Sequence, residues 1–335
     1  MNRRICNLLL ALACAIACGR ATAEAQEVRF AKQTSMGYVQ FNVLERHKLL
    51  EKHARALGLG EVKATWVTFS GPDAMNTALL AGDVDVVAGG VPALVILWAK
   101  TKDTPQEARG ISALSSQPFL LNTRNPNVKT IRDFTDASRI AVPAVGVSVQ
   151  AVTLRMAAAQ AFGKENYARL DPLTVALPPP DATIGLLSGG SAFDSVFSVP
   201  PFQAQQLQAP GIHTVLNSFD VLGGPHSFTV AWTSRRFHDE NPKLYRALLD
   251  ALAEATEILN ADKRAAAQLW MDDAKSKLPP ELVYDVIAGP QVKWTLVPEN
   301  TMKYASFMYD VGIVSAAPAT WKDLFFPEIY SMPGS

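Results

Sequence analysis

The residues that could do chemistry in this chain stand where predicted strands end and predicted helices begin. Ser70 precedes Gly71-Pro72-Asp73, and Ser148 precedes an amphipathic segment that starts at Val149. The first turn of a helix has N–H groups without acceptors in the helix, and its dipole favours a negative group there. A hydroxyl beside such N–H groups, and a glycine that lets a ligand approach the backbone, suit the binding of a small polar solute. The candidate contacts in these turns are Met36, Gly37, Tyr38, Ser70, Gly71, Gly90, Val91, Gly146, Val147 and Ser148.

Four further candidates stand at other strand ends or near places where the chain is expected to pass between domains: Ser116, Gln117, Ser198 and His226. The candidates also have ordinary structural explanations. Ser70 and Ser148 could simply cap their helices, Tyr38 could be a core residue, and a single histidine is more often structural than a ligand contact. Capping and ligand contact are compatible.

Other chemistries have little support in the sequence. Cys6, Cys14 and Cys18 all lie in the first 23 residues, so a chain processed after residue 23 would have no thiol nucleophile and no disulfide. The five histidines do not form an HExxH motif, and the nucleophile-elbow, Walker and dinucleotide motifs are missing. We therefore expect no metal, no cofactor and no enzymatic activity. The formal net charge of zero gives no basic field for nucleic acid.

The charge of the solute stays open at this point. Among the basic residues only Lys32 lies close to the predicted binding loops. An anion would therefore be held mainly by amides and hydroxyls, and a neutral or aromatic solute fits equally well.

These loops are positioned by a strand–helix–strand unit over residues 62–92. A β-branched and aromatic strand, Val62–Phe69, is followed by Pro72 at a first helical position, and Gly82 stands where that helix should end. A second strand, Val84–Ala88, closes the unit. The crossover predicts that the two strands are parallel neighbours, with ligands bound at their carboxyl ends.

The unit occurs twice. Pro72-Asp73-Ala74 recurs as Pro180-Asp181-Ala182, Leu79-Leu80-Ala81-Gly82 recurs as Leu186-Leu187-Ser188-Gly189, and the upstream strand Arg29-Phe30-Ala31 recurs as Arg139-Ile140-Ala141. The offset between the two copies is about 110 residues. The repeat predicts an α/β protein of two related lobes, each a mostly parallel sheet flanked by helices, whose strand ends face one another across a cleft.

The N-terminus predicts a secretory signal peptide over residues 1–23. Arg3 and Arg4 precede an apolar run, Ile5–Ala17, and Ala21-Thr22-Ala23 is a small-residue cleavage site. The run is too short for a membrane span. Cleavage before Cys18 with lipid anchoring is an alternative, but Ala15 is a poor match to lipoprotein signals. A periplasmic location is expected.

Four segments carry a likeness to a known family: VRFAKQTSMGYVQ, FSGPDAMNTALLAGDVDVVAGGVPALV, LNTRNPNVKTIRDFTDASRIAVPAVGVSVQ and LPPPDATIGLLSGGSAFDSVF. Taken together, they resemble the periplasmic substrate-binding proteins of nitrate/sulfonate/taurine-type ABC importers, which include thiamine-precursor binders. It implies a type II clamshell with two hinge crossings that captures a small molecule and delivers it to membrane permease and ATPase subunits. Ser198-Val199-Pro200-Pro201-Phe202 departs from relatives that carry a bulky aromatic or acidic group there, so the solute is not implied.

The expected lobes comprise 24–114 and 229–335 for the first and 115–228 for the second. One clamshell per chain makes a monomer the expected state. Two other functions remain open: a periplasmic sensor that passes its ligand state to a receptor, and, with less support, an enzyme on the same scaffold.

Overall fold

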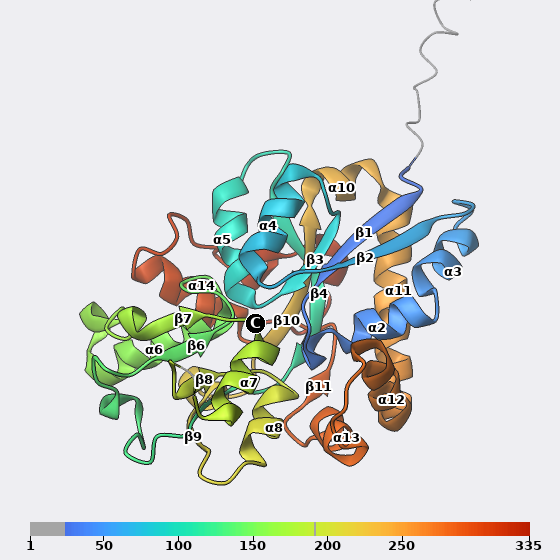
Figure 1. Cartoon of the computed structure of the whole chain (residues 1–335). Helices are drawn as coiled ribbons and strands as arrows, with labels where there is room; N and C mark the ends of the chain where they lie inside the picture. The colour runs from blue at the N-terminus through green and yellow to red at the C-terminus, as the bar shows by residue number, and fades with distance from the viewer. Residues whose placement is uncertain (1–23, 191) are drawn as a thin grey trace, which may run out of the picture.

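The computed structural model describes residues 24–190 and 192–335 of the 335-residue chain. The predicted signal peptide, with Cys18, lies outside the described residues. Within them, no helix has both the length and the apolar character needed to cross a membrane. Two sheets, each flanked by helices, form two lobes (Figure 1). This confirms the predicted α/β two-lobe architecture.

The first lobe is built on a six-stranded sheet in the order β11-β4-β10-β3-β1-β2. Four of its strands run in one direction, and β10 and β11 run against them. The strands are β1 (Glu27–Lys32), β2 (Lys63–Thr68), β3 (Val86–Gly89), β4 (Ala108–Ser116), β10 (Ser227–Ser234) and β11 (Lys293–Trp294).

The second lobe is built on a five-stranded sheet in the order β7-β6-β8-β5-β9, in which only β5 runs against the others. Both sheets are therefore mixed, although most strands in each share one direction, as predicted. The strands are β5 (Leu120–Thr123), β6 (Ile140–Val142), β7 (Thr174–Ala176), β8 (Ser195–Phe197) and β9 (His213–Asn217).

Helices cover the faces of both sheets (Figure 1). They are α2 (Val39–Arg46), α3 (Leu49–Ala56), α4 (Pro72–Ala81), α5 (Val91–Thr101), α6 (Val149–Phe162), α7 (Pro179–Ser188), α8 (Phe202–Leu207), α9 (Ser218–Leu222), α10 (Arg235–Glu240), α11 (Pro242–Ala261), α12 (Lys263–Ala274), α13 (Pro280–Ala288) and α14 (Thr301–Asp310). Short 3₁₀ turns are η1 (Met36–Tyr38), η2 (Ile131–Asp133), η3 (Lys164–Asn166), η4 (Asp171–Leu173), η5 (Trp321–Leu324) and η6 (Pro327–Ile329).

The repeated unit has the local structure that its prolines and glycines predict. Helix α4 begins with Pro72 and ends at Gly82, whose φ of 77° is left-handed; α7 begins with Pro179 and ends at Gly189, with φ of 78°. Proline suits the first helical position because the N–H it lacks would have no acceptor in the helix. Glycine suits the left-handed cap because it has no Cβ.

The prediction that the two strands of the repeated unit are adjacent in the sheet was wrong, although they are parallel. The strands on either side of α4, β2 and β3, are parallel but do not pair, because β1 lies between them and pairs with both. The second lobe has the same arrangement, with β6 between β7 and β8. The upstream strand of each repeat therefore inserts into the unit, and the duplication extends to strand order.

The helical segment from Val39 to Leu57 is divided into α2 and α3. Lys48, between them, adopts φ of 50°, which a continuous α-helix cannot contain.

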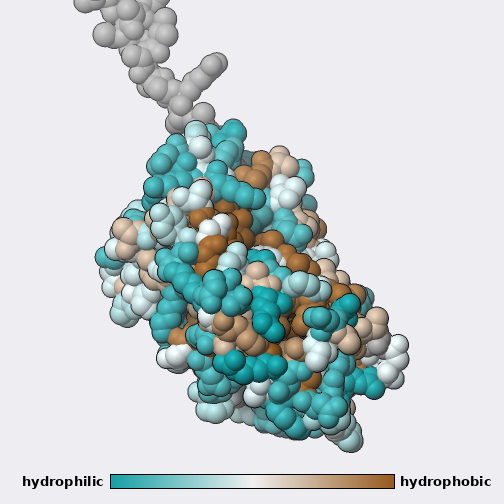
Figure 2. All heavy atoms as spheres, turned by 90° about the vertical axis from the view of Figure 1, so that its left-hand side faces the viewer, coloured by the Kyte–Doolittle hydropathy of each residue, from teal (hydrophilic) through white to brown (hydrophobic). Residues whose placement is uncertain are grey.

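The chain changes sheets twice, between β4 and β5 and between β9 and β10. Aromatic rings fill the space at these passages: Phe119 lies 5.2 Å from Phe197 and 5.6 Å from Phe228, centroid to centroid. The predicted lobe boundaries, at 114/115 and 228/229, stay a prediction. Away from this core, Figure 2 shows a face that is hydrophilic over most of its area, with apolar residues in separate patches.

Candidate functional site

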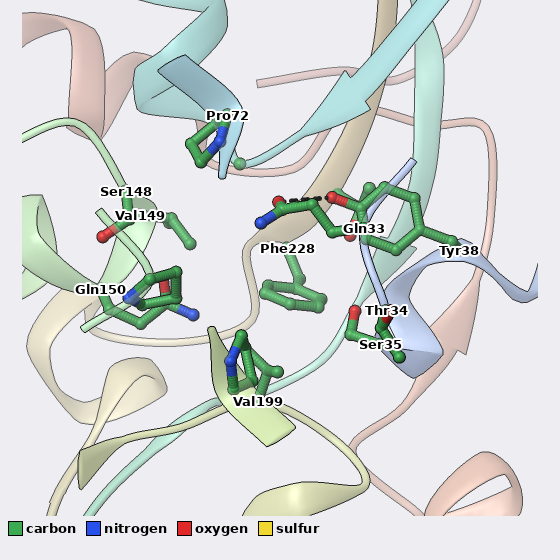
Figure 3. Close-up of a pocket in the computed structure, with 14 residues that line it drawn as sticks. Gln33, Thr34, Ser35, Tyr38, Pro72, Ser148, Val149, Gln150, Val199 and Phe228 are labelled. Carbon is green, nitrogen blue, oxygen red and sulfur yellow. Dashed lines mark hydrogen bonds between the residues drawn. The ribbon is translucent and has the colours of Figure 1, made fainter. Parts of the chain in front are cut away.

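A cavity of about 30 Å³ lies between the two lobes (Figure 3). The first lobe contributes the residues after β1, the starts of α4 and α5, and the beginning of β10. The second lobe contributes the residues after β6, the starts of α6 and α7, and the segment after β8. The lining residues are Gln33, Thr34, Ser35, Tyr38, Pro72, Gly90, Pro143, Ser148, Val149, Gln150, Pro179, Val199, Phe228 and Thr229.

Four helices begin at this cavity, two from each lobe. Pro72 is the first residue of α4, Gly90 caps α5, Ser148 caps α6, and Pro179 is the first residue of α7. The α4 and α7 helices are the repeated pair, so the duplicated fold places equivalent helix ends on opposite walls. The N-terminal ends of all four dipoles thus point toward one small volume.

Tyr38 is buried at the cavity, where its hydroxyl lies 2.8 Å from Gln33 Oε1 and 3.2 Å from the Ala88 carbonyl oxygen. Burial raises the pKa of the Tyr38 phenol, so the group is a neutral donor. The Gln33 amide Nε2 donates in turn to the Ser70 carbonyl at 3.3 Å. Gln33 therefore ties the loop after β1 to the loop before α4.

Glycines allow the walls to approach closely. A Cβ on Gly37 would lie 2.4 Å from Thr229 Oγ1, so η1 packs directly on β10. A Cβ on Gly90 would lie 2.5 Å from the Val149 Cβ of the other lobe. Gly71 also faces the other lobe, since its Cβ would lie 3.6 Å from the Pro143 carbonyl oxygen.

The Ser148 hydroxyl is used within the second lobe. It donates to the Ala144 carbonyl at 2.7 Å and accepts from the Ala151 N–H at 3.3 Å. Two predicted neighbours, Gly146 and Val147, lie in the same loop but do not line the cavity. Gly146 has φ of 75° and packs against Arg155, which pairs with Asp171.

Of the predicted residues, Tyr38, Gly90 and Ser148 line the cavity. Ser70 lines a second cavity of about 230 Å³, which shares Gln33, Thr34 and Pro179 with the first. The remaining predicted residues line neither: Met36, Gly37, Gly71, Val91, Ser116, Gln117, Gly146, Val147, Ser198 and His226.

Several of these have clear structural contacts. Met36 donates its N–H to the Pro200 carbonyl of the other lobe at 3.0 Å, and Ser198 Oγ accepts from Gln206 Nε2 at 3.1 Å. Gln117 Nε2 donates to Ser115 Oγ at 3.2 Å, and Val91 is the buried first residue of α5. By contrast, Ser116 Oγ and Gln117 Oε1 are buried without a hydrogen-bond partner among the described residues.

His226 is fully buried near the second passage between the sheets. Its Nε2 lies 2.9 Å from Ser218 Oγ, and its Nδ1 lies 3.0 Å from the Ser227 carbonyl oxygen. Burial lowers the pKa of this imidazole to about 4, while the Ser227 carbonyl and Glu299 oppose that shift. The ring is therefore neutral near pH 7, and it packs edge-on against Phe119, Phe219 and Tyr304.

Sequence reasoning missed several lining residues, above all Gln33, Gln150, Val199 and Phe228. Gln33 directly follows β1, and Gln150 is the second residue of α6, so both positions were readable as strand-end and helix-start positions. Phe228 and Val199 carried no such signal, because apolar residues near strands are ordinary core residues.

No residue lining the two cavities carries a formal charge. Lys32, the basic residue expected nearby, instead pairs with Glu45 at 2.7 Å and lies over the Trp66 ring. Among residues 24–190 and 192–335, no group of three or more His, Cys, Asp or Glu side chains could hold a metal ion. The site offers neutral donors, acceptors and apolar surface, which suits reversible binding.

Comparison with known proteins places this geometry in context. The chain is similar in structure to the alkanesulfonate-binding protein SsuA from Xanthomonas axonopodis pv. citri bound to MOPS, with 18% identity, 88% of this chain and 96% of that chain covered, and a TM-score of 0.66. It is similar to the aliphatic sulphonate binding protein SsuA from Escherichia coli, with 19% identity, coverage of 90% and 99%, and a TM-score of 0.65.

A third similar structure is the periplasmic nitrate-binding protein NrtA from Synechocystis PCC 6803, with 16% identity, coverage of 90% of this chain and 84% of that chain, and a TM-score of 0.69. At these identities the likeness establishes the fold. Among curated proteins, none matches this chain. The model of the NMT1-like family matches residues 21–271, which is most of the chain, and the protein therefore belongs to the NMT1-like family.

Proposed function

We propose that this protein is a periplasmic solute-binding protein that captures a small molecule between its two lobes and delivers it to an ABC importer. The observation that carries the proposal is the cavity between the lobes, lined by the starts of two helices from each side. Membership of the NMT1-like family and the fold shared with sulfonate- and nitrate-binding proteins support it.

The two lobes are in contact at the cavity, so a solute bound there can affect how they are arranged. The Met36 N–H donates a hydrogen bond to the Pro200 carbonyl, and Gly90 packs closely against Val149; both contacts join the first lobe to the second. A solute that contacts both walls binds the closed arrangement more tightly than the open one. This difference in affinity between the two arrangements is what shifts the population toward the closed one. The closed shape is then what the membrane permease recognises, and the permease passes the signal to the ATPase subunits.

The same proposal assigns the lobes to 24–114 with 229–335 and to 115–228. It takes Tyr38, Gly90 and Ser148, with Gln33 and Gln150, as the residues nearest the solute. The proposal assigns the protein a binding role without enzymatic activity; residues 24–335 contain no cysteine, so they offer no thiol nucleophile. The predicted signal peptide supports export, and a monomer is the expected state.

A thermal-shift screen of residues 24–335 tests the proposal. The panel is taurine, alkanesulfonates, nitrate, bicarbonate, pyrimidines, and aliphatic and aromatic carboxylates. A ligand at a hundred times its dissociation constant should add about 2.7 kcal/mol to the free energy of unfolding, a rise of several degrees. Small-angle scattering with the best ligand should then show a smaller radius of gyration, and stimulation of the reconstituted transporter's ATPase would test delivery. Stabilisation by none of the panel would contradict solute capture from these classes.

A further inference from the structure

The chemistry of the cavity narrows the class of solute, given the proposed binding function. The polar lining groups are amides and hydroxyls, without a carboxylate that could pair with an ammonium group or a cation that could neutralise a dianion. Burying an unpaired charge is costly, so zwitterions with an ammonium group and dianions are disfavoured. The remaining solutes are neutral or carry one negative charge.

Donors for a single negative group converge at the start of α6. Val149 and Gln150 are its first two residues, whose N–H groups have no acceptor within the helix, and its first turn contains no acidic residue. Gln150 is 2% exposed and lines the cavity, and no hydrogen bond joins its side chain to another described residue. Figure 3 shows this carboxamide extending toward Val199 and Phe228. Thr229, 1% exposed on β10, also lines the cavity, and its hydroxyl has no hydrogen bond to another described residue.

The repeated helices do not offer an equivalent set of donors. Pro72 removes the first N–H of α4, and Pro179 with Pro180 removes the first two of α7. Asp73 and Asp181 lie in the first turns of these helices, where a carboxylate offsets the positive end of the dipole.

Helix α5 also begins at the cavity, but Pro92 at its second position and the Ala93 N–H bond to the Gly90 carbonyl, at 3.0 Å, leave only the Val91 N–H free. The largest set of free donors is therefore at α6, where we expect the charged head of the solute to bind.

The volume distinguishes between kinds of head group. About 30 Å³ is room for about two water-sized spheres. A planar carboxylate, with two oxygens, needs less room at the start of α6 than a tetrahedral sulfonate with three, so a small cavity favours the carboxylate. The adjoining cavity of about 230 Å³ is lined by the Phe69 ring and Pro178, Pro179 and Pro180, with Gln33 and Thr34 shared between the two spaces. An apolar tail suits that second cavity.

We propose that the solute is a monocarboxylate with an apolar tail and no ammonium group. Its carboxylate accepts hydrogen bonds from the backbone N–H groups of Val149 and Gln150 and from the Gln150 side chain. Its tail passes Gln33 into the cavity beside Phe69 and the three prolines. Gln150 is thus the residue that sets specificity for the head group.

Calorimetric titration of residues 24–335 with matched ligands tests this assignment. Hexanoate and benzoate are compared with hexanesulfonate and benzenesulfonate, 6-aminohexanoate adds an ammonium group, and acetate removes the tail. We expect each carboxylate to bind at least tenfold more tightly than its sulfonate, 6-aminohexanoate or acetate. Tighter binding of the sulfonates, or no binding of the carboxylates, would overturn the proposal. Tight sulfonate binding would at the same time support the proposed solute-binding function, so the two failures are distinguishable.

Variants at Gln150 test the residue itself. Gln150→Glu keeps the size of the side chain and places a negative charge beside the carboxylate, so the carboxylate affinity should fall about tenfold to a hundredfold or more. Gln150→Leu should weaken it by a smaller factor within that range, because the backbone donors remain. Gln208→Glu, at an exposed position after α8, is the matched control and should bind as the original protein does. Thermal unfolding of each variant without ligand identifies loss of folding, and unchanged affinity in folded Gln150→Glu would refute the role of Gln150.

Discussion

Some buried polar side chains near the cavity have hydrogen-bond partners within the protein, and others have none. Tyr38, Ser148 and His226 each have protein partners, so they hold loops and passages in place. Gln150 has none among the described residues although it is almost fully buried. Since buried polar groups are nearly always paired, an unpaired one that faces a cavity is the better indication of ligand contact.

Ser148 is expected to act mainly on stability. Replacement by Ala removes the side-chain acceptor for the Ala151 N–H at the start of α6. Loss of such a cap should lower the free energy of unfolding by about 1 kcal/mol, measured by urea denaturation. Ser70→Ala is the control, because Ser70 is exposed and only its backbone carbonyl is bonded. Equal stability of the two variants would show that the Ser148 cap contributes nothing.

His226 should make stability depend on pH. Its folded-state pKa of about 4 lies below the unfolded value of 6.5, so the unfolded chain binds more protons between these values. The contribution of neutral His226 to the free energy of unfolding is fully present above pH 6.5 and is lost as the pH falls toward 4. The loss between pH 7 and pH 5 should be about 2 kcal/mol.

Urea denaturation at pH 7, 6 and 5 measures this term as the difference between the original protein and His226→Gln. The variant should lose less stability on acidification, because it has no imidazole to protonate. Parallel pH curves for the two proteins would mean that His226 is not buried in a neutral form.

At the scale of helices and strands, the sequence predicted those features that depend on neighbouring residues, such as where a helix begins and ends. Proline and glycine set the ends of α4 and α7, and their recurrence predicted two related lobes. Strand order was not readable, because the insertion of β1 between β2 and β3 depends on packing of whole helices against the sheet. Phe228 and Val199 line the cavity because the fold places β10 beside the segment after β8, and the sequence does not indicate that these two segments are neighbours.

The α14 helix joins elements of both lobes. It packs against α5 and α6, and the Tyr304 hydroxyl lies 2.9 Å from Thr153 Oγ1 on α6. Thr153 donates its own hydrogen to the Val149 carbonyl, so Tyr304 is the donor to Thr153. Because α14 also packs on α5 of the first lobe, this bond joins the two lobes, and under the proposed closure it would favour the arrangement that holds the solute.

Tyr304→Phe should therefore weaken solute binding. Loss of a bond worth about 1 kcal/mol raises the dissociation constant about fivefold. Calorimetric titration measures the change, and Tyr309→Phe, at a half-exposed position on the same helix, is the control. If Tyr304→Phe lowers the melting temperature without changing affinity, the bond contributes to folding but not to closure.

At the scale of the whole molecule, the proposed closure would depend on how closely the two walls of the cavity can approach each other. Gly90, at the start of α5, and Val149, at the start of α6, approach so closely that a Cβ on Gly90 would lie 2.5 Å from the Val149 Cβ. Gly90 has φ of −71°, a conformation open to any residue, so alanine there would be free of backbone strain. The added methyl group should act on the contact between lobes and leave each lobe intact.

Gly90→Ala should thus hold the lobes apart and weaken solute binding at least tenfold, because solute contacts to both walls are then made imperfectly. Titration gives the affinity, and small-angle scattering should show that ligand no longer reduces the radius of gyration. Gly190→Ala, where a Cβ meets nothing within 4 Å, is the control. Adding Val149→Gly to Gly90→Ala removes the opposing Cβ and should restore part of the affinity. Full affinity in Gly90→Ala alone would mean that the solute binds without this contact, and closure would then have to occur about a different part of the interface.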